Sequence, residues 1–163
     1  MREDVAWCHQ LRQPADPTSP ARVREFVVRH LQTHDRPDLV EPVRLVASEL
    51  TTNAVVHSGT ELLVTLLEDQ GTVVLSVEDQ RPHRWPSLEV ASATAERGRG
   101  LWIVEVLSED WGVRTEPGGS KAVWASFPAD PAESGAPACT CRATHPAVGA
   151  LSAPVLTLVP AEG

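Results

Sequence analysis

The spacing of apolar residues predicts two helices in the first sixty positions. Four apolar residues recur at helical spacing over residues 23–31. Ser19 and Pro20 precede them as a typical helix start, a capping side chain followed by Pro at the first helical position. The sequence HDRPD ends this helix. A second helix is expected to begin near Pro42 and to end at HSG, where Gly59 is a typical stop.

The next segments predict strands and one further helix. ELLVTLLED and TVVLSVED read as two strands joined by a tight turn at DQG, hence a hairpin. Residues 80–99 form an expected long loop, followed by the short apolar helix LWIVEVLSE. WGVRT and KAVWASF read as two strands around the turn EPGGS. This order predicts an α+β fold, a two-layer sandwich with helices over one face of a mixed, largely antiparallel sheet.

The character of the sequence changes after Phe127, which predicts one domain and a tail. Residues 1–127 carry the periodic segments, whereas residues 128–163 are rich in Pro, Ala, Gly and Ser. Such a segment buries too little apolar area to offset its ordering entropy, so a flexible tail is expected. The stretch VLTLV could still form a short strand or a docking peptide. Removal of residues 129–163 is expected to leave the melting temperature nearly unchanged.

Composition and charge narrow the function. A net charge of −8 over 163 residues argues against binding to a nucleic-acid backbone, which needs a basic surface. A nucleotide ligand needs only a local cluster of donors. The first residues form no apolar signal region and no apolar run is long enough to span a bilayer, so a cytoplasmic protein without membrane contact is expected.

The three cysteines do not favour a metal site. Cys8 stands alone, and Cys139 and Cys141 lie in CTCRATHP with His145 nearby. A zinc site typically has four ligands and a C-x-x-C spacing. Inert thiols are therefore expected.

A polar column marks the second predicted helix. Within SELTTNAVVHSG, Glu49, Asn53 and His57 are four residues apart, so each falls only about 40° from the one before around the helix. The column overlaps the edge of the buried stripe, while Arg44, Ser48, Thr51 and Thr52 are expected on the solvated side. A carboxylate and an amide group at the margin of a core need hydrogen-bond partners. Either they satisfy neighbouring backbone groups, or they serve a cation and nucleotide site.

Asp79 ends the apolar face of its strand. Alternation places Val73, Leu75, Val77 and Asp79 on one side. The carboxylate could simply belong to an outward turn, where Asp is common. It could instead be an acceptor at a pocket floor that reads an amino group through a hydrogen bond.

Glycines open the third predicted helix. In ERGRGLWIVEVL, Gly98 and Gly100 precede the apolar helix, and free N–H groups at such a helix start bind anions such as phosphate. Arg97 and Arg99 add positive charge. EPGGSKAVW adds a second glycine turn with Lys121, which is more often only a hairpin turn.

These motifs resemble, in their order, the Bergerat ATP-binding fold of the GHKL superfamily. SELTTNAVVHSG, the Asp at the strand end, RGRGLWIVEVL, WGV and GGSKAVWASF look most like the bacterial anti-sigma-factor serine/threonine kinases. The resemblance covers roughly residues 10–127 of the chain.

The resemblance implies roles for the column and the strand end. Asn53 would contact the Mg²⁺ that bridges the ATP phosphates. Glu49 would act as the catalytic base that orients the attacking hydroxyl. Asp79 would accept a hydrogen bond from the adenine amino group, and His57 would brace the helix end.

It also implies a phosphate-binding loop. Gly98 and Gly100, with the adjoining Leu101, would let backbone N–H groups approach the phosphates, and residues 80–99 would be the ATP lid. Lys121, Arg97 and Arg99 are the weaker candidates for nucleotide contacts.

The implied protein dimerises, holds a sigma factor inactive and phosphorylates a serine or threonine of a STAS-domain antagonist, thereby regulating transcription. The sequence departs from the family pattern at DQRPHRW, where D-x-G-x-G is usual. Loss of these glycines stiffens the adenine-side loop, so nucleotide binding is expected to survive better than phosphotransfer. A kinase is therefore set against two alternatives, an ATP-dependent module without kinase activity and an interaction domain with a vestigial pocket.

Overall fold

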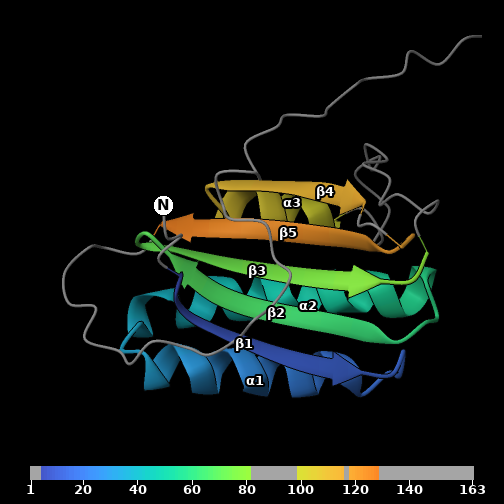
Figure 1. Ribbon diagram of the computed structural model, residues 1–163, viewed down its shortest axis with the longest axis horizontal. Coiled ribbons are helices and arrows are strands. Elements are labelled where there is room, and N and C mark those ends of the chain that lie inside the picture. The colour runs from blue at the N-terminus through green and yellow to red at the C-terminus, as the bar shows by residue number, and fades with distance from the viewer. Residues whose placement is uncertain (1–4, 82–98, 116–117, 129–163) are drawn as a thin grey trace, which may run out of the picture.

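The fold is a two-layer α/β sandwich in a computed structural model that describes residues 5–81, 99–115 and 118–128. The elements, in chain order, are β1 (Val5–Gln13), α1 (Ser19–Thr33), the 3₁₀ helix η1 (Pro37–Leu39), α2 (Val40–His57), β2 (Leu62–Asp69), β3 (Thr72–Asp79), α3 (Arg99–Leu107), β4 (Asp110–Thr115) and β5 (Lys121–Pro128) (Figure 1). The predicted tail lies outside the described residues apart from Pro128, which ends β5.

In the described ranges the sheet has five strands in the order β1-β2-β3-β5-β4, and every pairing between them is antiparallel. α1, α2 and α3 lie side by side over one face of the sheet (Figure 1). The predicted class is confirmed, and the structure makes the sheet antiparallel throughout its described strands. None of the described helices is long and apolar enough to cross a membrane.

The hairpin of β2 and β3 forms where the sequence predicts it. Gln70 and Gly71, the two residues between the strands, have φ values of 48° and 80°. Two consecutive left-handed residues give a turn whose twist matches that of the flanking strands. Asp69 therefore pairs with Thr72, and the register runs without interruption to Leu62 opposite Asp79.

The edge strand β1 was not predicted. Its inward side carries Trp7, His9 and Leu11, and a polar ring in the middle interrupts the apolar alternation that identifies a strand. Trp7 is nevertheless buried, and its indole N–H donates to Oε2 of Glu68 on β2 at 2.7 Å. Contacts with other elements thus stabilise β1, although its own alternation of apolar residues is weak.

The helix starts differ slightly from the prediction. α1 begins at Ser19 itself, so Thr18 is the N-cap, and the Ser19 hydroxyl donates to the carbonyl of Pro14 rather than capping the helix. α2 begins at Val40, two residues before Pro42, because η1 leads directly into it.

A histidine cluster, comprising His9, His30 and His34, fills the junction of β1 and α1. The rings of His9 and His30 stack at 3.8 Å, and Nε2 of His9 lies 2.7 Å from Nε2 of His34. Trp7 stacks on His34 at 4.3 Å. Burial, with His9, Arg29 and His34 nearby, lowers the pKa of His30 to about 4. The pKa values of His9 and His34 are lowered as well, chiefly by burial.

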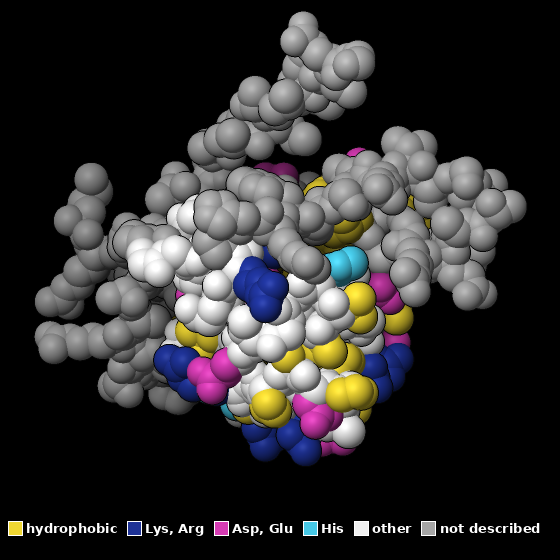
Figure 2. Space-filling model, turned by 90° about the vertical axis from the view of Figure 1, so that its right-hand side faces the viewer, with side chains coloured by type: hydrophobic (Ala, Val, Ile, Leu, Met, Phe, Trp, Pro, Cys, Tyr) yellow, Lys and Arg dark blue, Asp and Glu magenta, His cyan; other side chains and the backbone are white. Residues whose placement is uncertain are grey.

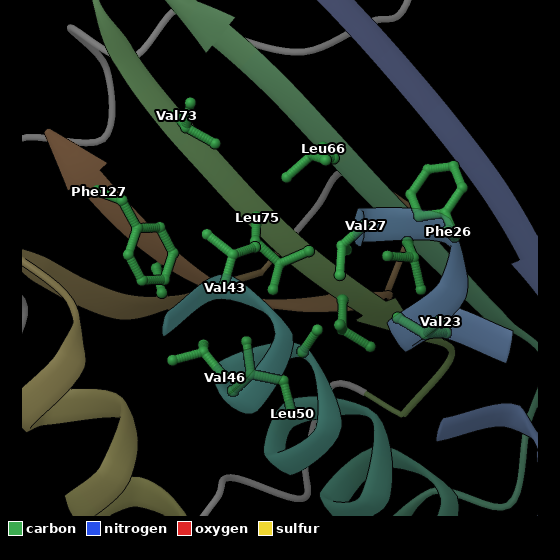
Figure 3. Packing of buried hydrophobic residues seen from close by; sticks show 14 of the residues in the cluster. Val23, Phe26, Val27, Val43, Val46, Leu50, Leu66, Val73, Leu75 and Phe127 are labelled. Atoms are coloured by element: carbon green, nitrogen blue, oxygen red, sulfur yellow. The ribbon is translucent and has the colours of Figure 1, made fainter. Parts of the chain in front are cut away.

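The main core lies between the helix layer and the sheet. Side chains from α1, α2, β2 and β3 gather there, among them Val27, Val43, Leu66 and Leu75 (Figure 3). Each is fully buried, which is worth about 1.5–3 kcal/mol per side chain. This packing holds α2 across the middle of the sheet and so sets where its polar residues lie.

One residue of α2 contradicts the predicted solvated side. Thr51 is completely buried, and its hydroxyl has no hydrogen-bond partner among the described residues. It lies one turn from Ser48, whose hydroxyl accepts from Nη1 of Arg24 on α1 at 2.8 Å. The prediction treated α2 as a surface helix with one buried side, but α2 is the central helix of the layer and α1 covers this second side.

Candidate functional site

A pocket opens where α2 ends, β3 ends, β5 begins and α3 begins. It is lined by Leu50, Asn53, Ala54, His57, Val77, Asp79, Leu101, Lys121 and Val123. Figure 2 looks toward this end of the molecule, and basic and acidic side chains are interspersed where its described residues are visible. Residues predicted from four separate motifs thus meet at one place.

The polar column of α2 faces the first turn of α3. A methyl group added at Gly100 would lie 2.7 Å from Oε2 of Glu49 and 3.6 Å from Nδ2 of Asn53. The bare glycine is therefore what lets α3 approach these two side chains. Within the described part of the chain, neither Glu49 nor Asn53 makes a side-chain hydrogen bond or ion pair. Among the described residues, Glu49 and Asn53 therefore do not satisfy neighbouring backbone groups, which was the first alternative.

Asp79 lies at the floor of the pocket. Oδ1 accepts from the backbone N–H of Arg81 at 2.8 Å, and Oδ2 lies 3.2 Å from Nζ of Lys121. The side chains of Asp79 and Lys121 are only 3% and 5% exposed. One oxygen therefore accepts within a turn, while the carboxylate as a whole is buried at the pocket; recognition of an amino group by Asp79 stays a prediction.

The pairing of Lys121 with Asp79 was missed by sequence reasoning. The two residues face each other in the register of β3 and β5, although 42 positions separate them along the chain. Lys121 opens β5 directly after a glycine turn, so it was interpreted mainly as a hairpin residue. Only the pairing of two non-consecutive strands brings its ammonium group to the carboxylate.

The pocket walls are apolar. Leu50, Ala54, Val77 and Val123 come from α2, β3 and β5 and also pack in or against the core. Binding pockets typically combine such walls with a few polar groups that fix orientation. A signal for these residues existed in the sequence, since Val77 lies two positions before Asp79 and Val123 two positions after Lys121 on alternating strands.

The remaining predicted residues are placed only in part. Gly100 and Leu101 lie in the first turn of α3, and Leu101 is buried in the pocket wall. Arg99 begins α3, while Arg97, Gly98 and most of the predicted lid, residues 82–98, lie outside the described residues. His57 is exposed in the last turn of α2 and lines the pocket rim.

The donor set at the pocket suits a hard cation. Carboxylate and amide oxygens are what Mg²⁺ takes from proteins, and it needs only one or two of them beside phosphate oxygens. Asn53 lines the pocket, and Glu49 lies beside the lining and faces Gly100, so the two side chains together carry the oxygens that such an ion takes. No cluster of three or more His, Cys, Asp or Glu with metal-binding geometry occurs among the residues that the structure describes. Cys139, Cys141 and His145 lie outside them.

Comparisons with known proteins identify the family and the fold of this chain. The family model described as a histidine kinase-like ATPase domain matches residues 13–127, more than half of the chain. The crystal structure of the RsbU and RsbW domains of Rv1364c from Mycobacterium tuberculosis is similar in fold, with a TM-score of 0.55 and 18% identity. That match covers 81% of this chain and 33% of the other, so this chain spans about a third of the length of its structural relative. No curated protein matches the sequence.

Proposed function

This chain belongs to the histidine kinase-like ATPase domain family, and from that premise we propose that its pocket binds Mg-ATP and uses it to phosphorylate a protein partner. Family membership makes ATP the expected nucleotide. The observation that carries the proposal is the pair of oxygen-bearing side chains, Glu49 and Asn53, held against the bare Gly100 without partners among the described residues.

The base is proposed to lie between the apolar walls with its edge toward Asp79. The phosphates would extend toward the first turn of α3, where Gly100 leaves the backbone accessible to them. Asn53 would supply an amide oxygen to Mg²⁺, which neutralises charge on the phosphates when bound. With these assignments the nucleotide would extend without interruption from the end of β3 and the start of β5 to the first turn of α3.

Glu49 is proposed to act as the base in phosphoryl transfer. A serine or threonine hydroxyl of the partner would attack the γ-phosphorus while its proton passes to the Glu49 carboxylate. The bond from the γ-phosphorus to the bridging oxygen breaks, and ADP leaves with the electron pair. A carboxylate that is partly buried and otherwise unpaired in the described residues suits this task.

The partner classes rest on the resemblance of the sequence motifs. We propose a STAS-domain antagonist as phosphoryl acceptor and a sigma factor as the regulated protein, with a homodimer as the working unit in the cytoplasm. The fold shared with the Mycobacterium tuberculosis structure is compatible with these classes. An ATP-dependent binding module without transfer is the second candidate, favoured by the absence of glycines from DQRPHRW.

Calorimetric titration with a non-hydrolysable ATP analogue, with and without Mg²⁺, tests the site. We expect Mg-dependent binding by the natural chain and its loss in Asn53→Ala. Thr52→Ala is the matched control, since Thr52 is the exposed neighbour on the same helix. Unchanged affinity in Asn53→Ala would remove the metal role, and no heat with the natural chain would remove the nucleotide site.

Transfer is tested separately with Glu49→Ala. This variant should bind the nucleotide like the natural chain but lose transfer of labelled γ-phosphate to a STAS-domain partner. If Glu49→Ala transfers phosphate at the natural rate, Glu49 is not the base. If the natural chain binds the nucleotide and transfers none, the module without kinase activity is the correct function.

A further inference from the structure

The pocket floor holds a buried ion pair of unusual composition for this chain. Lys121 is the only lysine of the sequence, and all other basic side chains apart from histidine are arginines. Its Nζ lies 3.2 Å from Oδ2 of Asp79 in a setting where both side chains are almost fully buried. Desolvating two ions is costly, and apolar residues of similar volume often stabilise a fold as well or better. A role in ligand recognition explains the pair better than sheet stability does.

Asp79 already has a donor at each oxygen. The N–H of Arg81 occupies Oδ1 and the ammonium group of Lys121 lies beside Oδ2. The first contact orients the carboxylate, and the second neutralises it. A base that enters the pocket therefore meets a carboxylate oxygen with a cationic donor next to it, rather than a carboxylate alone.

This arrangement changes which nucleobases the pocket can recognise. A lone carboxylate accepts from the 6-amino group of adenine and repels the 6-oxo oxygen of hypoxanthine or guanine. A carboxylate beside an ammonium group offers one acceptor and one donor. Adenine satisfies both groups when its amino group donates to Asp79 and its N1 accepts from Lys121. A 6-oxopurine satisfies the same two groups with its edge reversed relative to adenine, so that its N1–H donates to Asp79 and its 6-oxo oxygen accepts from Lys121.

Resting on the proposed nucleotide site, the geometry points to Lys121 as a base-reading residue that lets the pocket accept 6-oxopurine nucleotides together with adenine nucleotides. Without this lysine the floor selects for adenine. Hypoxanthine is the most informative 6-oxopurine, because it differs from adenine only at positions 1 and 6 and adds no 2-amino group.

The test compares ADP with IDP, which avoids turnover. Dissociation constants are measured by calorimetry with Mg²⁺ for the full chain, for Lys121→Met and for Lys121→Arg. We expect IDP to bind within about tenfold of ADP to the natural chain. Lys121→Met, which keeps length and removes the charge, should raise the ratio of the IDP constant to the ADP constant by about tenfold or more. Lys121→Arg keeps a donor and should retain the natural ratio.

Three results are decisive against parts of this scheme. IDP binding more than about a hundredfold weaker than ADP to the natural chain overturns the base-reading role of Lys121 and leaves the nucleotide site intact. Equal weakening of both nucleotides in Lys121→Met also overturns it, since Lys121 then only supports the pocket. If neither ADP nor the ATP analogue binds, the proposed function itself fails and the inference falls with it.

A second measurement does not depend on the folding of any variant. Selective ¹³C labelling of lysine places the label at a single side chain of this protein, so one ε-methylene resonance reports on Lys121. ADP and IDP at saturation should each shift this resonance, and to different positions, because Lys121 donates to a ring nitrogen in one case and to an oxo oxygen in the other. A saturated protein with an unmoved resonance would exclude the contact.

Discussion

Replacement of Gly100 by Ala tests whether α3 must lack a side chain at the position that faces Glu49. The added Cβ would lie 2.7 Å from Oε2 of Glu49, whereas ordinary contact begins at 3.4 Å, so the carboxylate must retreat by about 0.7 Å. Asn53, at 3.6 Å, is not displaced. The backbone tolerates the change, because Gly100 is helical and Ala is favoured over Gly in a helix by about 1 kcal/mol.

The expected result is a separation of stability from catalysis. Misplacing a reacting group by about 1 Å can cost about a hundredfold in rate, so Gly100→Ala should lower γ-phosphate transfer by roughly ten- to a hundredfold. Its melting temperature should stay equal or rise. Its affinity for the Mg-bound ATP analogue should fall less than its transfer rate, because the added methyl group also narrows the approach of the phosphates to the backbone of α3.

The assay measures transfer of labelled phosphate, the melting temperature and the dissociation constant on the same preparations. Glu105→Ala, at an exposed position of α3, is the matched control and should behave like the natural chain in all three. Natural transfer by Gly100→Ala would refute the placement of Glu49 as base. A large loss of stability would mean that the fold, rather than the flexible carboxylate, absorbs the clash.

Further predictions concern stability. The histidine cluster has folded-state pKa values below the ordinary 6.5, so the unfolded chain takes up protons first and stability falls as the pH drops from about 6.5 toward 4. His30 accounts for about 1 kcal/mol of this loss, a figure reduced because its ring is partly exposed. The free energy of urea unfolding should therefore depend less steeply on pH in His30→Gln than in the natural chain. An unchanged dependence on pH would contradict this prediction. Thr51→Val removes a buried hydroxyl without a partner and should stabilise the protein by about 1 kcal/mol in the same assay, whereas a destabilised variant would show that the hydroxyl is satisfied. Arg36→Met leaves the buried carboxylate of Glu68 without its ion pair at 2.8 Å and should cost about 3 kcal/mol; a loss below about 1 kcal/mol would mean that the Trp7 indole N–H suffices.

Local patterns predicted most elements because their physical causes are local. Helical spacing identified α1, α2 and α3, and the turn at Gln70 and Gly71 joined β2 to β3 in the predicted hairpin. β1 escaped prediction because a strand at the sheet edge tolerates polar inward residues when other elements supply partners. His9 finds them on α1, and Trp7 finds Glu68 on β2.

The sequence by itself determined the order of elements from α1 onward apart from η1, the α+β class and the set of motifs with which the chain resembles ATP-binding proteins. Helix periodicity aligned Glu49 with Asn53, and strand alternation put Asp79 at the end of an apolar face. Only the tertiary structure decided that α2 is the central helix and therefore buries Thr51, that Gly100 meets Glu49, and that Lys121 lies opposite Asp79. Periodicity tells which side of an element a residue occupies, but the neighbour on that side depends on strand order and helix packing between segments far apart in the chain.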